Sequence, residues 1–276
     1  MAMHEQRHVL VTGANSGIGL ATVLELARRG FRVTGTVRSE AKAQTVADAA
    51  AEAGVEVATV ELDVTDADRC EAVLAELGPL HGLVNNAGYG VTGAIEDVPD
   101  DEARQVLETM VVAPMRLARL AVPGMREAGG GRIVNISSIY GRMTTPLTGW
   151  YQGSKHALEA LSDALRIEVA KNGIHVVLIE PGGFRTNIWE DLERDLEKRR
   201  GSRYESAYQR VGGLTSLWSP LMGEPASCAK AIARALQTPI PRPRYLVGAD
   251  AKLAATADRL TPAMVKDRVL RVVQGL

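Results

Sequence analysis

Apolar and polar positions along this chain follow two alternating patterns. Short apolar runs, such as Val176–Ile179, are typical of strands buried on both faces of a sheet. Between these runs, apolar residues recur every three or four positions, which is typical of helices with one buried face. The predicted strands lie near His8–Val11, Arg32–Val37, Glu56–Glu61, Gly82–Asn85, Gly131–Ser137, His175–Glu180 and Arg244–Gly248. The predicted helices lie near 17–29, 40–53, 66–77, 100–128, 150–172 and 224–237.

This alternation predicts an α/β fold, a doubly wound parallel sheet of about seven strands with helices on both faces. A length of 276 residues suits one domain over residues 1–276. Ligands of such sheets bind beyond the carboxyl ends of the strands, where the strand order switches. The turns at Gly13, Asn86–Gly88, Ser138 and Pro181–Gly182 all follow predicted strands, so we expect them to share one site.

Residues 184–222 interrupt the alternation, because they are too long for an ordinary strand-to-helix connection. Ile188, Leu192 and Leu196 recur there at helical spacing among many charged residues. We interpret the charges as a solvated helix face and the apolar edge as the packed side. The segment is predicted to be a lid that covers the site and excludes water.

Composition gives little support to nucleic acid or membrane partners. The net charge is −1, and the polar N-terminus carries no apolar signal region. No apolar run approaches the length of a membrane span, so we expect no membrane insertion. Cys70 and Cys228 form no motif and resemble small apolar helix positions, which fits a reducing cytoplasm.

The first strand leads into a glycine-rich turn and then a helix. Glycines let the backbone approach a pyrophosphate closely, and the helix N-terminus offers free N–H groups and partial positive charge. The alternative is an ordinary glycine turn, which the spacing of three glycines makes the weaker interpretation. The residues expected to form this anion site are Gly13, Asn15, Ser16, Gly17, Ile18 and Gly19.

A second pattern joins Ser138, Tyr151 and Lys155. Tyr151 and Lys155 are four residues apart, so they share one face of a helix. An ammonium beside a phenol stabilises the phenolate and lowers a pKa that is ordinarily about 10. A neighbouring serine hydroxyl could hold a carbonyl or alcohol oxygen. These groups together suit proton transfer to or from a hydroxyl.

The two motifs, in this order, resemble those of the short-chain dehydrogenase/reductase superfamily, whose fold is of the Rossmann type. The runs Asn85-Asn86-Ala87-Gly88 and Pro181-Gly182-Gly183 strengthen the resemblance, which is close over roughly residues 7–190. The resemblance implies hydride transfer at nicotinamide, with Tyr151 as general acid or base, Lys155 lowering its pKa and holding the nicotinamide ribose, and Ser138 orienting the substrate oxygen. It further implies cofactor contacts at Asn86, Ala87, Gly88, Pro181, Gly182 and Thr186.

The second predicted strand indicates which cofactor is bound. A carboxylate commonly holds the adenosine ribose at such a strand end, but Val37 and Arg38 stand there instead. Arg38, helped by Ser39, could bind a 2′-phosphate, which favours NADP(H) over NAD(H). A solvated loop position for Arg38 is the alternative. Asp63, with Val64 beside it, matches the family position at adenine, although an aspartate there could also cap the following helix.

One residue departs from the family pattern. The family usually has an asparagine in the long helix before Ser138, thought to hold a water that relays protons to lysine, and Met110 occupies that place. A thioether is a poor acceptor and no donor, so we expect an altered relay and slower turnover. Met110 could equally be a plain core residue.

The chemistry of the substrate is indicated only by aromatic residues. Several are predicted near the site, which suits a bulky apolar or ring-bearing ketone or alcohol, although they could instead anchor loops. Imine or enone reduction, epimerisation, dehydration and non-enzymatic NADP(H) sensing remain alternatives. The helices at 100–128 and 150–172 are those through which the family forms homodimers and homotetramers. The aromatic residues are Tyr89, Tyr140, Trp150, Trp189, Tyr204, Tyr208 and Trp218.

Overall fold

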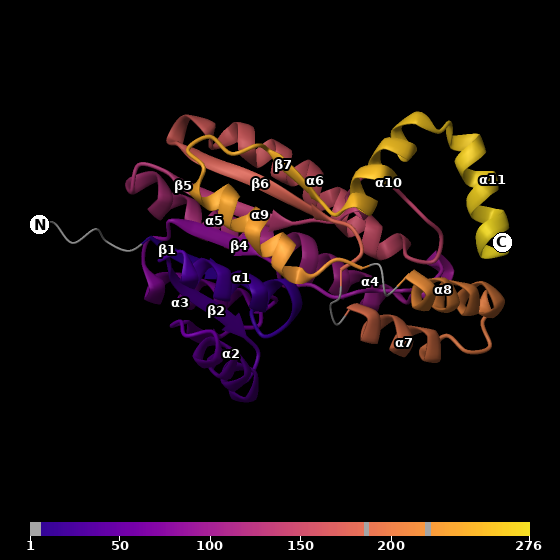
Figure 1. Ribbon diagram of the computed structural model, residues 1–276, viewed down its shortest axis with the longest axis horizontal. Helices are drawn as coiled ribbons and strands as arrows, with labels where there is room; N and C mark the ends of the chain where they lie inside the picture. The colour runs from indigo at the N-terminus through magenta and orange to yellow at the C-terminus, as the bar shows by residue number, and fades with distance from the viewer. Residues whose placement is uncertain (1–6, 185–187, 219–221) are drawn as a thin grey trace, which may run out of the picture.

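The computed structural model describes residues 7–184, 188–218 and 222–276. A seven-stranded sheet forms its centre, in the order β3-β2-β1-β4-β5-β6-β7, and each neighbouring pair is parallel. Helices cover both faces, so the predicted doubly wound architecture is confirmed (Figure 1). The strands are β1 His8–Val11, β2 Arg32–Val37, β3 Ala58–Glu61, β4 Gly82–Asn85, β5 Gly131–Ile136, β6 Ile174–Pro181 and β7 Arg244–Val247.

The helices of the central fold agree closely with those predicted. They are α1 Gly17–Arg28, α2 Glu40–Glu52, α3 Ala67–Leu77, α4 Asp100–Leu107, α5 Ala113–Glu127, α6 Gly149–Glu168 and α9 Pro225–Gln237. The N-cap of α3 is Asp66, whose carboxylate accepts from the N–H of Arg69. Asp63 therefore does not cap this helix.

The alternation of side chains along each strand separates two cores. Val9 and Val11 of β1 face one side, where they pack with residues of α1, α2 and α9. Leu10 faces the other side and packs with residues of α3 and α5. All three side chains are fully buried, as expected for parallel strands covered on both faces.

The predicted single helix at 100–128 is divided. A π-helical turn, Glu108–Val112, joins α4 to α5. Pro114 follows this turn and has no N–H to donate to the carbonyl of Met110, so a regular helix cannot continue through it. Single π turns often lie at functional sites, and this one carries Thr109 and Met110.

Four further helices gather at one end of the molecule, beyond the sheet (Figure 1). The predicted lid contains α7 Ile188–Lys198 and α8 Glu205–Trp218. Two C-terminal helices, α10 Ala249–Leu260 and α11 Ala263–Gln274, were not predicted. Their large apolar residues are mostly exposed, yet those of α11 recur at helical spacing, a signal that the sequence prediction missed.

Candidate active site

The glycine turn after β1 is held to the loop after β4. The hydroxyl of Thr12 accepts hydrogen bonds from the N–H groups of Asn86 and Ala87, each at 2.9 Å. In return, the amide of Asn86 donates to the carbonyls of Thr12 at 2.9 Å and Gly13 at 3.1 Å. Gly13 has φ +66°, a left-handed conformation that favours glycine. The two loops therefore form one rigid edge of the site.

Ser138, Tyr151 and Lys155 come together as the sequence predicts. The hydroxyls of Ser138 and Tyr151 are hydrogen-bonded. The ammonium nitrogen of Lys155 lies 5.6 Å from the centre of the Tyr151 ring and donates to the carbonyl of Ile136 at 2.9 Å. Ser138 and Lys155 are each only 6% exposed, so these polar groups are largely shielded from water.

Burial dominates the protonation of this group. It raises the pKa of Tyr151 to about 12, and the hydrogen bond from Ser138 offsets only part of that rise. Burial also lowers the pKa of Lys155 to about 8, although the negative charge of Glu159 acts to raise it. The net shift of the Tyr151 pKa is therefore upward, so burial outweighs the lowering that the sequence predicted from Lys155. At neutral pH the phenol keeps its proton and Lys155 keeps its charge, a state suited to protonating a carbonyl oxygen.

One cavity of about 1400 Å³ connects these groups to the glycine turn. Of the predicted residues, Gly19 and Ser39 do not line it, and Thr186 lies outside the described residues. Gly19 instead packs directly against the carbonyl of Gly13 in the glycine turn. The predicted residues that do line the cavity are Gly13, Asn15, Ser16, Gly17, Ile18, Arg38, Asp63, Val64, Asn86, Ala87, Gly88, Ser138, Tyr151, Lys155, Pro181 and Gly182.

The far end of the cavity has two cationic side chains, Arg38 and Lys42. Lys42 was not predicted, although it stands one helical turn beyond Arg38 on α2. The carboxylate of Asp63 also lines this end and accepts from the N–H and hydroxyl of Thr65 at 2.9 and 2.7 Å. These bonds and the charge of Arg38 lower the pKa of Asp63 despite its partial burial, so the carboxylate stays charged.

Met110 lines the cavity and is 1% exposed. Its sulfur lies 3.2 Å from the point where a Cβ on Gly88 would stand, so the thioether packs directly against the loop after β4. A regular helix would turn Thr109 away from the side that Met110 faces, but Thr109 also lines the cavity and is hydrogen-bonded to the Tyr89 hydroxyl. The π turn changes the direction of successive side chains, which explains this difference.

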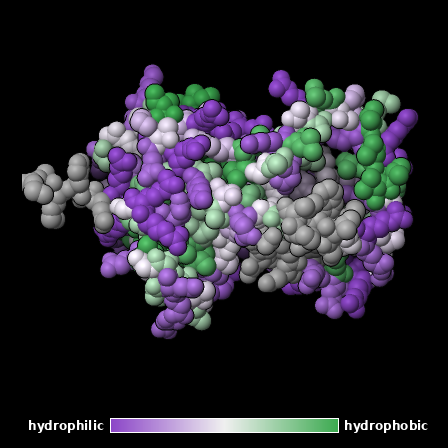
Figure 2. Space-filling view, viewed as in Figure 1, coloured by the Kyte–Doolittle hydropathy of each residue, from purple (hydrophilic) through white to green (hydrophobic). Residues whose placement is uncertain are grey.

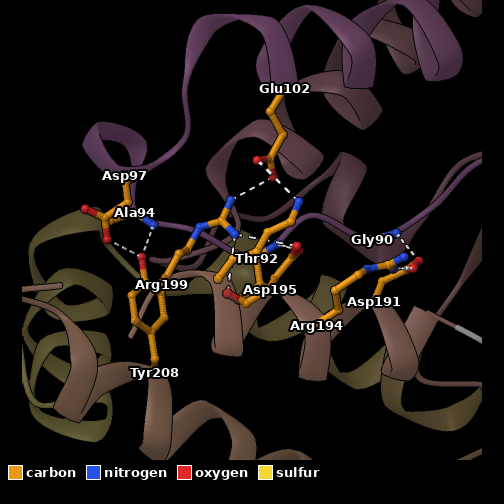
Figure 3. Close-up of polar contacts among 11 residues, drawn as sticks. Gly90, Thr92, Ala94, Asp97, Glu102, Asp191, Arg194, Asp195, Arg199 and Tyr208 are labelled. Carbon is orange, nitrogen blue, oxygen red and sulfur yellow. Dashed lines mark hydrogen bonds and ion pairs between the residues drawn. The ribbon is translucent and has the colours of Figure 1, made fainter. Parts of the chain in front are cut away.

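The lid is attached to the loop at residues 90–94 by polar contacts (Figure 3). Three lid side chains accept from alternate N–H groups of this loop, as the edge of a neighbouring strand would. The pairs are Gly90 N–H to Asp191 at 3.0 Å, Thr92 N–H to Asp195 at 2.8 Å and Ala94 N–H to Tyr208 at 2.7 Å.

Two charges of the lid are buried, so the prediction of a wholly solvated charged face was wrong. Asp195 is 4% exposed and Arg199 is 7% exposed. Arg199 donates to the carboxylate of Glu102 on α4 at 2.7 Å and lies 3.5 Å from that of Asp195. The i, i+4 spacing of these residues aims both charges at the body of the protein.

The predicted aromatic residues divide into two groups. Tyr89 and Tyr140 line the cavity. Tyr204 and Tyr208 instead donate hydrogen bonds to Glu96 and Asp97, so they anchor the lid to its neighbouring loop. Trp150 is half-buried beside Tyr89 and Tyr151, and it does not line the cavity. The side chains of Trp189 and Trp218 lie outside the described residues.

The chain is similar to known proteins in sequence and in fold. The family of short chain dehydrogenases matches residues 7–197. The chain is 34% identical over 270 residues to the uncharacterized oxidoreductase YusZ of Bacillus subtilis, covering 95% of this chain and 96% of that one. It is 31% identical over 286 residues to retinol dehydrogenase 7 of Rattus norvegicus, covering 96% of this chain and 88% of that one. The structure of the F189W actinorhodin polyketide ketoreductase with NADPH matches with a TM-score of 0.78 and 28% identity, covering 92% and 99%.

This chain belongs to the short-chain dehydrogenase/reductase family and is an oxidoreductase that binds a nicotinamide cofactor. The cavity fits such a dinucleotide. At Gly19 an added Cβ would meet the carbonyl oxygen of Gly13 at 2.1 Å, so only glycine lets α1 approach the turn this closely. In the described part of the chain, no helix is both long and apolar enough to cross a membrane.

Substituting Gly19 by Ala should weaken NADPH binding by at least about tenfold, an energy of about 1.4 kcal/mol. The new methyl group must displace backbone at Gly13, which leaves the turn unable to hold its shape. Fluorescence titration with NADPH measures the affinity. Gly153→Ala is the control, because nothing lies within 4 Å of its added Cβ. Equal affinity in both variants would contradict the prediction.

Substituting Asp195 by Ala should loosen the lid, because it leaves the Thr92 N–H without its acceptor and removes one partner of Arg199. We expect a loss of about 1–3 kcal/mol in the free energy of unfolding and faster amide hydrogen exchange at residues 90–94. Exchange mass spectrometry and thermal denaturation measure these effects. Glu197→Ala is the control, since Glu197 and its partner Arg200 are 73% and 75% exposed. The prediction fails if the two variants behave alike.

Proposed function

We propose that the protein is an NADP(H)-dependent ketoreductase or secondary alcohol dehydrogenase for bulky apolar or ring-bearing substrates. The observation that carries the proposal is the shared cavity, in which Ser138, Tyr151 and Lys155 face the glycine turn. Binding of a dinucleotide alone has no need of a half-buried phenol hydrogen-bonded to serine. This group favours proton transfer to an oxygen over a sensing role.

Tyr151 is the proposed general acid in reduction and general base in oxidation. Its hydroxyl proton passes to the carbonyl oxygen of the substrate, which Ser138 holds by a hydrogen bond. The bound nicotinamide supplies or accepts the hydride. Lys155 stays charged beside the phenol and stabilises the phenolate that remains after proton transfer. The raised pKa of Tyr151 keeps the phenol protonated at neutral pH, as its role as general acid requires.

The preference for NADP(H) rests on the cationic end of the cavity. Arg38 and Lys42 can both reach a 2′-phosphate there, whereas the strand end β2 offers no carboxylate for a ribose hydroxyl. A guanidinium–phosphate contact is worth about 1.5–3 kcal/mol. The similar polyketide ketoreductase structure contains NADPH, which is consistent with this proposal.

The proposed substrate class rests on what surrounds Tyr151. The cavity that contains Tyr151 is lined by several apolar and aromatic side chains, alongside polar ones such as Gln105 and Thr109, and apolar walls favour ring systems over small polar carbonyl compounds. Two similar proteins are named for a retinol and a polyketide, which are bulky compounds. The apolar and aromatic lining residues are Tyr89, Val91, Met110, Ile139, Tyr140, Met143 and Phe184.

We further propose assembly as a homodimer or homotetramer through α5 and α6. Leu161 and Ile167 of α6 are 42% and 74% exposed, and Val112, directly before α5, is 45% exposed. Packing between copies would cover these apolar side chains. The lid at 184–222 is proposed to close over the substrate and to remain part of the single domain.

Substituting Tyr151 by Phe should lower the NADPH-dependent reduction of bulky ketones by at least about 10²–10⁴-fold, because the proton donor is removed. The affinity for NADPH should stay within a factor of about three. Absorbance at 340 nm follows turnover with a panel of ring-bearing ketones and quinones, and fluorescence titration follows binding. Retained turnover in this variant would refute the proposed role of Tyr151.

Substituting Arg38 by Ala should reduce the ratio of kcat/KM for NADPH to that for NADH by about ten- to hundredfold. The loss should fall on NADPH alone, because NADH has no 2′-phosphate to contact. Arg69→Ala is the control, because Arg69 lies outside the cavity lining and pairs with Glu76. A fall in kcat/KM that is equal for both cofactors would show that Arg38 does not recognise the phosphate.

A further inference from the structure

The two C-terminal helices expose an unusual amount of apolar surface. Soluble chains commonly expose single large apolar side chains, but groups of them mark an interaction site. Figure 2 shows hydrophobic side chains gathered along α11 at the edge of the molecule. The exposed residues are Leu253 and Leu260 of α10, Met264, Val265, Val269, Val272 and Val273 of α11, and Leu276 at the C-terminus.

The apolar residues of α11 form one stripe. At 100° per residue, Val265, Val269, Val272 and Val273 fall within about 100° of the helix circumference. These four side chains are each 49–78% exposed. The stripe lies on the side of the helix away from Gln274, which is 9% exposed, and it has no covering element in the described part of the chain.

Basic side chains border this stripe. Lys266 lies on one side of it and Arg268 on the other, with Arg271 beyond. Residues 249–276 contain five basic and three acidic side chains, a net charge of +2 in a chain whose total is −1. Two of the acids are engaged, since Asp250 accepts from the Gly183 N–H at 2.6 Å and Asp258 pairs with Lys266 at 2.6 Å. Without Asp250 and the Asp258–Lys266 pair, four basic side chains and one acidic side chain remain, so the exposed charge of the two helices is mainly positive.

We propose that α10 and α11 form a docking surface for an anionic lipid membrane. An amphipathic helix with an apolar stripe between basic residues lies in the plane of the interface, with its apolar side chains among the acyl chains. Lysine and arginine stems then extend along the helix, and their charged heads meet lipid phosphates. This peripheral contact requires no membrane-spanning segment.

A second copy of the chain fits this surface less well. Most pairs of identical chains meet about a two-fold axis, which places each surface patch against itself. Such a contact would bring the arginines bordering one stripe close to those of its copy. The exposed acids of α10 and α11 are too few to neutralise them. An anionic lipid surface satisfies both the apolar and the basic groups.

The docking surface adjoins the active site. Ala249, Asp250 and Ala254 of α10 and Gln274 of α11 line the cavity that contains Tyr151. A docked molecule would thus present this end of the cavity to the bilayer, where apolar compounds dissolve. Delivery of apolar substrate from the bilayer to the cavity rests on the proposed function. Membrane docking itself does not, because it requires no turnover.

Vesicle flotation of the full-length chain tests the docking directly. We expect binding to phosphatidylcholine vesicles that contain phosphatidylserine, and weaker binding to phosphatidylcholine alone or at high salt. The double variant Val269→Asp, Val272→Asp should lower the partition coefficient at least about tenfold. The double variant Arg268→Gln, Arg271→Gln should lower the partition coefficient about fivefold for each arginine removed. This loss should appear on anionic vesicles and not on phosphatidylcholine alone.

The control is Ile240→Asp, which removes an apolar side chain that is 82% exposed in the connection between α9 and β7. It should leave flotation unchanged, and all variants should keep NADPH affinity, which shows that they are folded. Absence of flotation on anionic vesicles would overturn the proposal. An equal loss of vesicle binding in Ile240→Asp would also overturn it. So would sedimentation that shows a concentration-dependent dimer which Val269→Asp dissociates. None of these outcomes depends on whether ketones are reduced.

Discussion

The reciprocal hydrogen bonds between Thr12 and Asn86 are the constraint on which the site depends. β1 pairs with β2 on one side and β4 on the other, so the chain leaves the sheet in opposite directions at this point. Each of the two loops that begin there would be loose alone. Because Thr12 and Asn86 satisfy one another's backbone groups, the loops hold one shape, which fixes the glycine turn and places Gly88 against Met110.

Buried charge has different consequences beside Tyr151 and at the contact between α7 and α4. Beside Tyr151, burial holds the phenol neutral and lowers the pKa of Lys155, which would tune the proposed proton transfer. At the lid, the ion pair of Arg199 and Glu102 is shielded from water. Such a pair adds little net stability, because desolvation offsets much of the attraction. We interpret it as fixing where the lid sits.

The sequence predicted the parts of the structure that have a local cause. Strands buried on both faces, the glycine turn and the Tyr151–Lys155 spacing each leave a regular pattern, and the structure has all three. Contacts between distant segments leave no such pattern. Nothing near Asp195 in the sequence indicates that its carboxylate meets the N–H of Thr92, about a hundred residues earlier. Helix α11 is a different case, because its apolar residues, such as Val265, Val269 and Val272, do recur at helical spacing and the prediction missed that local signal.

The spacing of the lid contacts limits how the lid can move. Asp191 and Asp195 are one helical turn apart, and they accept from N–H groups two residues apart on an extended loop. A turn of helix and two extended residues have similar rises, about 5–7 Å. A small slide along the loop would therefore break both hydrogen bonds before either could form again. The proposed lid would accordingly act as a latch with discrete registers along the loop, because partial displacement leaves both acceptors unpaired.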